Sequence, residues 1–80
     1  MKIRVLGMGC PRCGKLYENA RKALEDLEIE DLILEKVEDL SVIAEMGAML
    51  TPALALDEEI VVSGRVPSPG EIRKLLEERL

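Results

Sequence analysis

The order of strand-like and helix-like segments is the feature of this sequence that most constrains its fold. Residues 2–6, KIRVL, alternate charged with β-branched side chains, which is the period of a strand. A helix of about four turns then begins at Pro11, because apolar residues recur at helical spacing as far as Leu27. Residues 31–37 predict a second strand, and residues 38–47 predict a second helix.

The last third of the chain predicts two more strands and a final helix. Residues 51–56 and 60–64 are short apolar segments joined by a tight turn at Asp57 and Glu58, and the final helix covers residues 68–80. Two consecutive strand–helix units imply parallel strands, and the late pair implies an antiparallel edge. We therefore expect an α/β fold of order βαβαββα, with a four-stranded mixed sheet flanked by three helices.

Capping residues support the second and third helices. Asp39 or Ser41 can cap the start of the second helix, and Gly47 can end it in a left-handed conformation. Ser68, followed three residues later by Glu71, predicts a capping box at the start of the third.

The composition fits a single domain over residues 1–80. Apolar residues make up 48% of the chain and aromatic residues only 1%, so the core must consist of aliphatic side chains and methionine. The formal net charge of −5 opposes the attraction to phosphate on which nucleic-acid binding depends, so no nucleic-acid partner is expected.

No segment has the length and apolar character of a signal-peptide core or a membrane-spanning helix. We therefore expect a soluble, cytoplasmic protein without a membrane partner. In a reducing cytosol, a pair of cysteines is more consistent with a redox cycle or metal binding than with a permanent structural disulfide.

The only two cysteines, Cys10 and Cys13, are separated by Pro11 and Arg12. In the expected element order, Cys10 is the N-cap of the first helix. The backbone N–H groups of the first turn and the helix dipole favour its thiolate there, and Arg12, Lys15 and Arg65 add positive charge if they lie near it. Cys10 is therefore the expected nucleophile, with a lowered pKa.

Cys13 lies one turn further along the same helix face, at a spacing that a disulfide can span. It is the expected resolving thiol. Cys10 would attack a target disulfide to form a mixed disulfide, and Cys13 would then attack Cys10 to release the reduced target. This cycle requires no metal or organic cofactor beyond the reversible Cys10–Cys13 disulfide.

A second unusual motif is Thr51-Pro52 at the start of a predicted strand. Proline cannot donate to the hydrogen-bond ladder, so this position suggests a special backbone conformation. A cis bond would expose the backbone groups of Thr51 to an extended peptide, although the residues alone favour the trans form.

Several motifs together resemble those of a known family. A strand, then GCPRC at a helix start, LTPAL about forty residues later, a hairpin and a final helix resemble the thioredoxin fold. With the VSGRVPSPGEI segment, the chain resembles the small archaeal and bacterial thioredoxin-like and glutaredoxin-like redox-active disulfide proteins. The resemblance spans nearly all 80 residues.

The resemblance implies a thiol–disulfide oxidoreductase that reduces protein disulfides. It carries over Cys10 as nucleophile, Cys13 as resolving thiol and Pro52 as a cis-proline that faces them. An upstream disulfide reductase is the implied electron donor, and the expected state is a monomer. We expect a docked substrate to contact Met8, Gly9, Gly64 and Arg65.

The sequence also departs from the family pattern. Thioredoxins usually have tryptophan where Gly9 stands, and Gly-Pro rather than Pro-Arg between the cysteines. They also bury a carboxylate in the strand before the site, and here no acid precedes Glu18, so the proton acceptor of Cys13 is undetermined. The segment after the last strand lacks the glutaredoxin pattern, which argues against glutathione as the donor.

Metal binding is the alternative interpretation. Met8, Cys10 and Cys13 resemble the motif of copper-carrying domains, and two thiolates suit Cu(I). Those domains finish on a strand, however, whereas this chain finishes on a capped helix. A lone Cys-x-x-Cys cannot close a structural zinc site within one chain. The order of elements therefore favours disulfide exchange, with no metal site expected.

Overall fold

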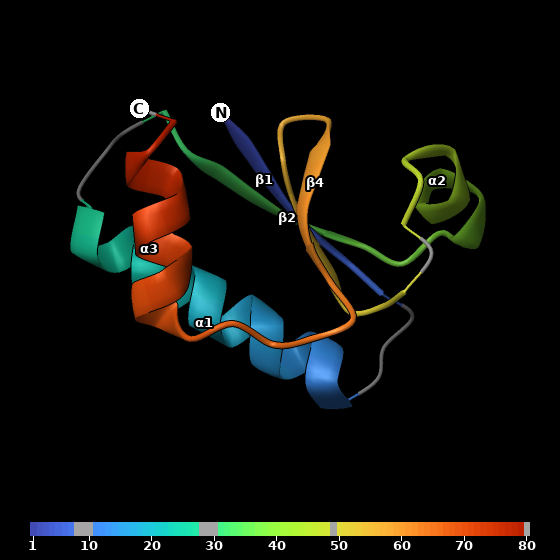
Figure 1. The fold of residues 1–80 in the computed structure, drawn as a ribbon, viewed down its shortest axis with the longest axis horizontal. Helices are drawn as coiled ribbons and strands as arrows, with labels where there is room; N and C mark the ends of the chain where they lie inside the picture. The colour runs from blue at the N-terminus through green and yellow to red at the C-terminus, as the bar shows by residue number, and fades with distance from the viewer. Residues whose placement is uncertain (8–10, 28–30, 49, 80) are drawn as a thin grey trace.

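Four strands form one mixed sheet in the computed structural model, which describes residues 1–7, 11–27, 31–48 and 50–79 (Figure 1). The strand order across the sheet is β2-β1-β3-β4. β1 pairs in parallel with β2 and antiparallel with β3, which in turn pairs antiparallel with β4. The strands are β1 (Lys2–Leu6), β2 (Ile33–Val37), β3 (Ala53–Leu56) and β4 (Glu59–Ser63).

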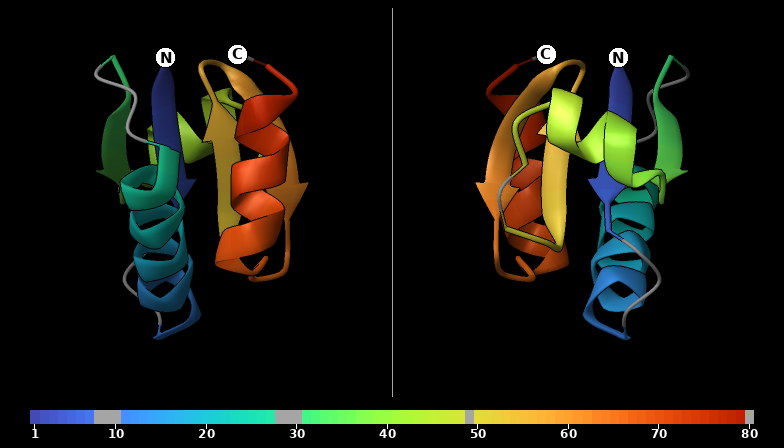
Figure 2. Two further views of the ribbon diagram at one scale, coloured as in Figure 1. Left: turned by 90° about the vertical axis from the view of Figure 1, so that its left-hand side faces the viewer. Right: turned by 90° about the vertical axis from the view of Figure 1, so that its right-hand side faces the viewer.

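Helices cover both faces of this sheet. The helices α1 (Pro11–Leu27) and α3 (Pro69–Glu77) pack side by side on one face, and the short α2 (Leu40–Glu45) lies on the other (Figure 2). The element order is βαβαββα, and the predicted α/β fold of four strands and three helices is confirmed.

Alternation along the central strands divides the core between the two faces. Ile3 and Val5 of β1 belong to the larger apolar cluster, which they form with α1, α3, β3 and β4. Leu6 belongs to a smaller cluster that includes Ile43 of α2. All four side chains of β3 are buried, because this central strand is covered on both faces. The period of two in the sequence therefore assigns the two faces of β1 correctly.

Two strands begin later than the sequence predicts. β2 begins at Ile33 rather than at residue 31, because parallel pairing with β1 starts at the Lys2–Ile33 register. β3 begins at Ala53 rather than at residue 51, since Ala53 is the partner of Leu6 at the end of β1. The length of β1 therefore sets both boundaries.

The caps are partly as predicted. The Asp39 side chain accepts a hydrogen bond from Ser41 N at the start of α2, and Gly47 has a φ of 83° just beyond its end. Ser68 Oγ accepts from Glu71 N at 3.2 Å at the start of α3. The reciprocal half of the predicted capping box is wrong, because the Glu71 carboxylate is bound by Arg65 instead.

Candidate active site

The candidate site lies at the C-terminal end of the central strand β1, next to the first turn of α1. Gly7 follows β1, is buried, and donates its N–H to the carbonyl of Val37 at 3.0 Å. Cys13 is the third residue of α1 and its side chain is only 1% exposed. It is bonded in a disulfide. A sulfur atom is therefore enclosed between the end of the central strand and the start of the helix.

Gly7 and Cys13 are in close contact. A Cβ atom on Gly7 would overlap the Cys13 sulfur and would lie 3.2 Å from Cys13 Cβ. The same atom would lie 4.0 Å from Cα of Pro52. Gly7 therefore brings together the helix that carries Cys13 and the segment that carries Pro52, and only a residue without a side chain fits between them.

The segment before β3 has the special backbone that the sequence suggested. The bond between Thr51 and Pro52 is cis, the form that the family resemblance implied and the residues alone did not favour. Pro52 is buried and Thr51 is exposed. The Pro52 carbonyl accepts a hydrogen bond from Gly64 N at 2.9 Å, which holds the segment against the end of β4.

Gly64 also connects this segment to α1. The Nη2 atom of Arg12 donates to the Gly64 carbonyl at 3.1 Å. Gly64 has a φ of 79°, in the left-handed region that favours glycine. A Cβ at this position would lie 3.2 Å from Cδ1 of Leu50, whose side chain is 62% exposed. Arg12, Gly64 and Leu50 therefore form a continuous surface beside the buried sulfur.

Arg65, another basic residue expected near the site, is ion-paired with Glu71. Both of its terminal nitrogens donate to the Glu71 carboxylate. The hydrogen bond from Arg65 lowers the pKa of Glu71 below its ordinary value, and the pKa of Arg65 is raised in return. Because the pair is exposed, solvent screens it strongly. Arg65 therefore contributes less positive charge to the site than the sequence suggested.

The structure tests the other predicted positions only in part. Met8, Gly9 and Cys10 lie outside the described residues. Pro11 begins α1 and is exposed, as is Arg12. Within the described ranges, no group of three His, Cys, Asp or Glu side chains could hold a metal ion.

Sequence reasoning missed Asn19, the only buried polar residue in the described part of the chain. Its Nδ2 atom donates to the carbonyl of Pro67 at 2.9 Å, which ties α1 to the loop before α3. The signal was available, because Asn19 lies on the same helix face as the apolar residues Leu16 and Ala23. A polar residue within an apolar stripe predicts a buried hydrogen bond.

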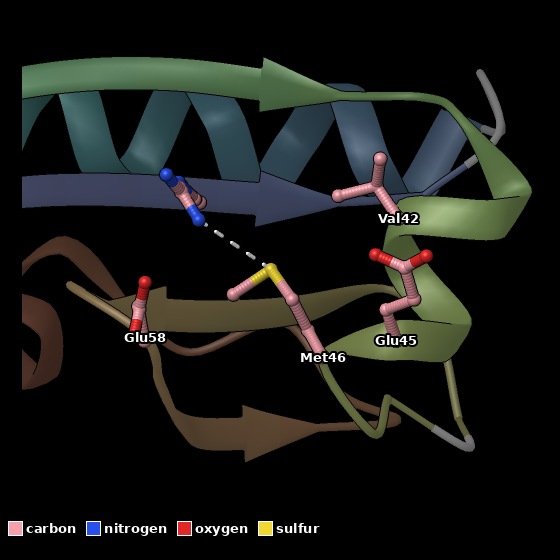
Figure 3. A pocket seen from close by; sticks show the side chains of 5 residues that line it. Val42, Glu45, Met46 and Glu58 are labelled. Carbon is pink, nitrogen blue, oxygen red and sulfur yellow. Dashed lines mark hydrogen bonds between the residues drawn. The ribbon is translucent and has the colours of Figure 1, made fainter.

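A pocket lies elsewhere, on the sheet face that carries α2 (Figure 3). Arg4 lines this pocket, where its Nη1 atom lies 3.7 Å from the Met46 sulfur and its Nε atom lies 3.3 Å from the Glu35 carboxylate. Neither Cys13 nor Pro52 lines this pocket. It is therefore separate from the candidate active site.

A thioredoxin domain family matches residues 1–77 of the chain. The chain belongs to this family. A thioredoxin of Methanocaldococcus jannaschii is 45% identical over 78 residues, which cover 98% of this chain and 88% of that protein. A thioredoxin of Methanothermobacter thermautotrophicus is 43% identical over 76 residues, which cover 95% of this chain and 97% of that protein.

These relatives confirm the resemblance to small thioredoxin-like proteins that the motifs indicated. The chain is a thiol–disulfide oxidoreductase, and protein disulfides are the general kind of substrate for such a protein. The element order βαβαββα and the family match favour disulfide exchange over the copper-chaperone alternative. None of the helices in the described ranges is long and apolar enough to cross a membrane.

Proposed function

We propose that this thioredoxin-family protein reduces protein disulfides through a dithiol cycle on Cys10 and Cys13. The Cys10 thiolate attacks one sulfur of the target disulfide, the target disulfide bond breaks, and the first target thiolate leaves. The Cys13 thiolate then attacks Cys10, and the second target thiolate leaves. Two electrons pass to the target, which takes up two protons, and the Cys10–Cys13 disulfide remains.

The burial of Cys13 carries this proposal. Its side chain is 1% exposed and its sulfur lies against Gly7, so an external disulfide could not reach this sulfur. A buried thiol can still attack a sulfur bound to a residue three positions away on the same helix. This supports Cys13 as the resolving thiol and Cys10 as the nucleophile.

The surroundings of Cys13 support roles for its neighbours. Pro52 approaches from the segment before β3 and would cover one side of the disulfide. Thr51 is exposed beside it and could offer its backbone to an extended substrate. Pro11 and Arg12 occupy the first turn of α1, and Gly64 lies across from them.

The proposed cycle uses the cysteine pair alone, without a metal or organic cofactor. A protein disulfide reductase would return two electrons to the Cys10–Cys13 disulfide, in preference to glutathione. We place the cycle in the cytoplasm, because a cysteine pair that must be reduced after every turnover suits a reducing compartment. We also expect the protein to act as a monomer.

Trapping experiments test the assigned roles. Cys13→Ser should accumulate a mixed disulfide with a peptide disulfide, because nothing remains to resolve it, whereas Cys10→Ser should trap almost none. The adducts would be quantified by non-reducing mass spectrometry. The double variant Cys10→Ser/Cys13→Ser is the control for adventitious adducts. Equal trapping by the two single variants would exclude the assignment.

A further inference from the structure

Positive charge is concentrated in the part of the chain that carries the site. Although the whole chain has a net charge of −5, its first 24 residues contain six of the 11 basic residues and one of the 16 acidic residues. The first helical turns of α1 belong to this segment. Two of these basic residues, Arg12 and Lys15, lie in the first turns of α1 together with Cys13. The residues are Lys2, Arg4, Arg12, Lys15, Arg21, Lys22 and the single acid Glu18.

The acids Glu18 and Glu25 of α1 form their ion pairs with Arg21, although Glu18 also attracts Lys15 electrostatically. Arg21 binds both Glu18 and Glu25, at 2.9 and 2.7 Å. Within the described ranges, neither Arg12 nor Lys15 forms an ion pair with a carboxylate. Both side chains are exposed. We call Arg12 and Lys15 the basic flank.

Geometry holds the basic flank beside the site. Arg12 and Lys15 are three residues apart, so their side chains lie on neighbouring turns of one helix face. The hydrogen bond from Arg12 to the Gly64 carbonyl keeps one of the two charges next to exposed Leu50. An incoming chain that contacts Leu50 would therefore have a fixed positive charge at its side.

Acids close to the same sheet edge are already engaged. Glu38 follows the end of β2 and lies 3.9 Å from Lys36, and the Asp39 carboxylate caps α2. In the first turn of α3, Glu71 is bound by Arg65. None of these carboxylates contacts the basic flank in the described part of the chain.

We propose that the basic flank selects protein disulfides whose cysteines are bordered by acidic side chains. The inference rests on the proposed function and adds a substrate class to it. Opposite charges on two proteins raise their rate of association and orient the partner. Like charges at the same place lower the rate of association and disfavour that orientation. A partner with Asp or Glu beside its disulfide would meet Arg12 and Lys15, whereas one with Lys or Arg would be repelled.

Single-turnover reduction of matched peptides tests this inference. The pre-reduced protein is mixed with a peptide that contains one disulfide bordered by Glu, or with the same peptide bordered by Lys. A third reaction uses hydroxyethyl disulfide, which is small and neutral. Acid quenching and mass spectrometry give the second-order rate constant for each, at low ionic strength and in 1 M NaCl.

Lys15→Glu is compared with Lys22→Glu. Both lysines are exposed on α1, neither has an ion pair in the described part of the chain, and both variants change the net charge equally. Only Lys15 lies on the turn next to Arg12. Lys15→Glu should reduce the preference for the acidic peptide about threefold to tenfold at low ionic strength, and Lys22→Glu should change it much less.

The outcomes separate this inference from the function on which it rests. In 1 M NaCl, where the screening length is about 3 Å, the preference of the wild-type protein should largely disappear. Reduction of all three disulfides without a preference for the acidic peptide would overturn the inference but leave the proposed function intact. An equal effect of Lys15→Glu and Lys22→Glu would also overturn it. Failure to reduce even hydroxyethyl disulfide would overturn the proposed function, and this inference with it.

Discussion

Gly7, at the end of β1, lies directly against the Cys13 sulfur. Its Cα lies so close to the sulfur that a Cβ atom at this position would overlap it. Backbone Gly7 N is also held by the Val37 carbonyl at 3.0 Å, so this residue cannot move away without breaking the continuation of the β1–β2 pairing. The contact therefore couples the sheet to the Cys13 sulfur through a residue that has no side chain.

Gly7→Ala should lower both stability and activity. The added methyl group must push the Cys13 side chain aside, and overpacking of this kind costs about 1–3 kcal/mol. The free energy of unfolding from urea denaturation and the rate of reduction of a peptide disulfide give the two readouts. The rate should fall even where the variant remains folded, because the sulfur is displaced.

Gly14→Ala is the matched control for Gly7→Ala. Gly14 is adjacent to Cys13 in the helix, and a Cβ there meets no atom within 4 Å. Alanine in place of a helical glycine should stabilise the protein by about 0.5–1 kcal/mol. A loss of stability in Gly14→Ala as large as that in Gly7→Ala would contradict the role assigned to the Gly7 contact.

Gly64→Ala tests the surface formed by Arg12, Gly64 and Leu50. Two effects oppose alanine there: the left-handed backbone, which costs about 1–2 kcal/mol for a residue with a side chain, and the contact of 3.2 Å with Leu50. Gly47 has a similar φ of 83° but open space around its Cβ position. Urea denaturation should therefore show a larger loss in Gly64→Ala than in Gly47→Ala.

The double variant Gly64→Ala/Leu50→Ala separates the two effects. Removal of the Leu50 side chain relieves the crowding and leaves the backbone strain. The stability difference between the double variant and Leu50→Ala should therefore equal the loss that Gly47→Ala causes in the wild-type protein. Equal losses in Gly47→Ala and Gly64→Ala would show that Leu50 moves aside without cost.

Local patterns in the sequence predict most of the elements but not all of their ends. The period of two in β1 and the stripe of α1 identify most of the buried side chains, although not Asn19, since each pattern depends only on near neighbours. The starts of β2 and β3 depend on where β1 offers partners, which is a property of the pairing between strands. Local reasoning therefore placed both starts two residues too early.

The site was predictable to a similar extent. The spacing of the cysteines indicates Cys13 as a candidate, and the family resemblance indicates Pro52. The contact between Gly7 and Cys13 does not follow, because a glycine after a strand indicates only a break in the pattern until the tertiary structure brings another segment onto it. Likewise, Glu71 had two possible partners, and the approach of Arg65 across the loop decided between them.

Asn19→Leu should destabilise the protein although it adds apolar volume to a buried position. The substitution removes the donor to the Pro67 carbonyl, and a buried acceptor without a partner costs about 1–3 kcal/mol. Urea denaturation measures the loss. Lys22→Leu, at an exposed position of the same helix, should change stability by less than about 0.5 kcal/mol. A more stable Asn19→Leu would mean that the hydrogen bond contributes less than the added apolar contacts.

The Arg65–Glu71 pair should make stability depend on pH in the acidic range. The hydrogen bond from Arg65 lowers the pKa of Glu71 from its ordinary value of 4.5, so the folded state binds this proton less readily than the unfolded state. The resulting stabilisation is fully present above the unfolded pKa and is lost as the pH falls through the lower folded value. Glu71→Gln should therefore reduce the change in the free energy of unfolding between about pH 6 and about pH 3.

Glu58→Gln is the control for this pH dependence. Glu58 is exposed and forms no ion pair in the described part of the chain. Urea denaturation at a series of pH values should give a shallower slope for Glu71→Gln than for Glu58→Gln, and the difference should shrink in 1 M NaCl because the pair is exposed and easily screened. Identical slopes in the two variants would show that the Arg65–Glu71 pair does not persist in solution, and Arg65 would then add its charge to the basic flank.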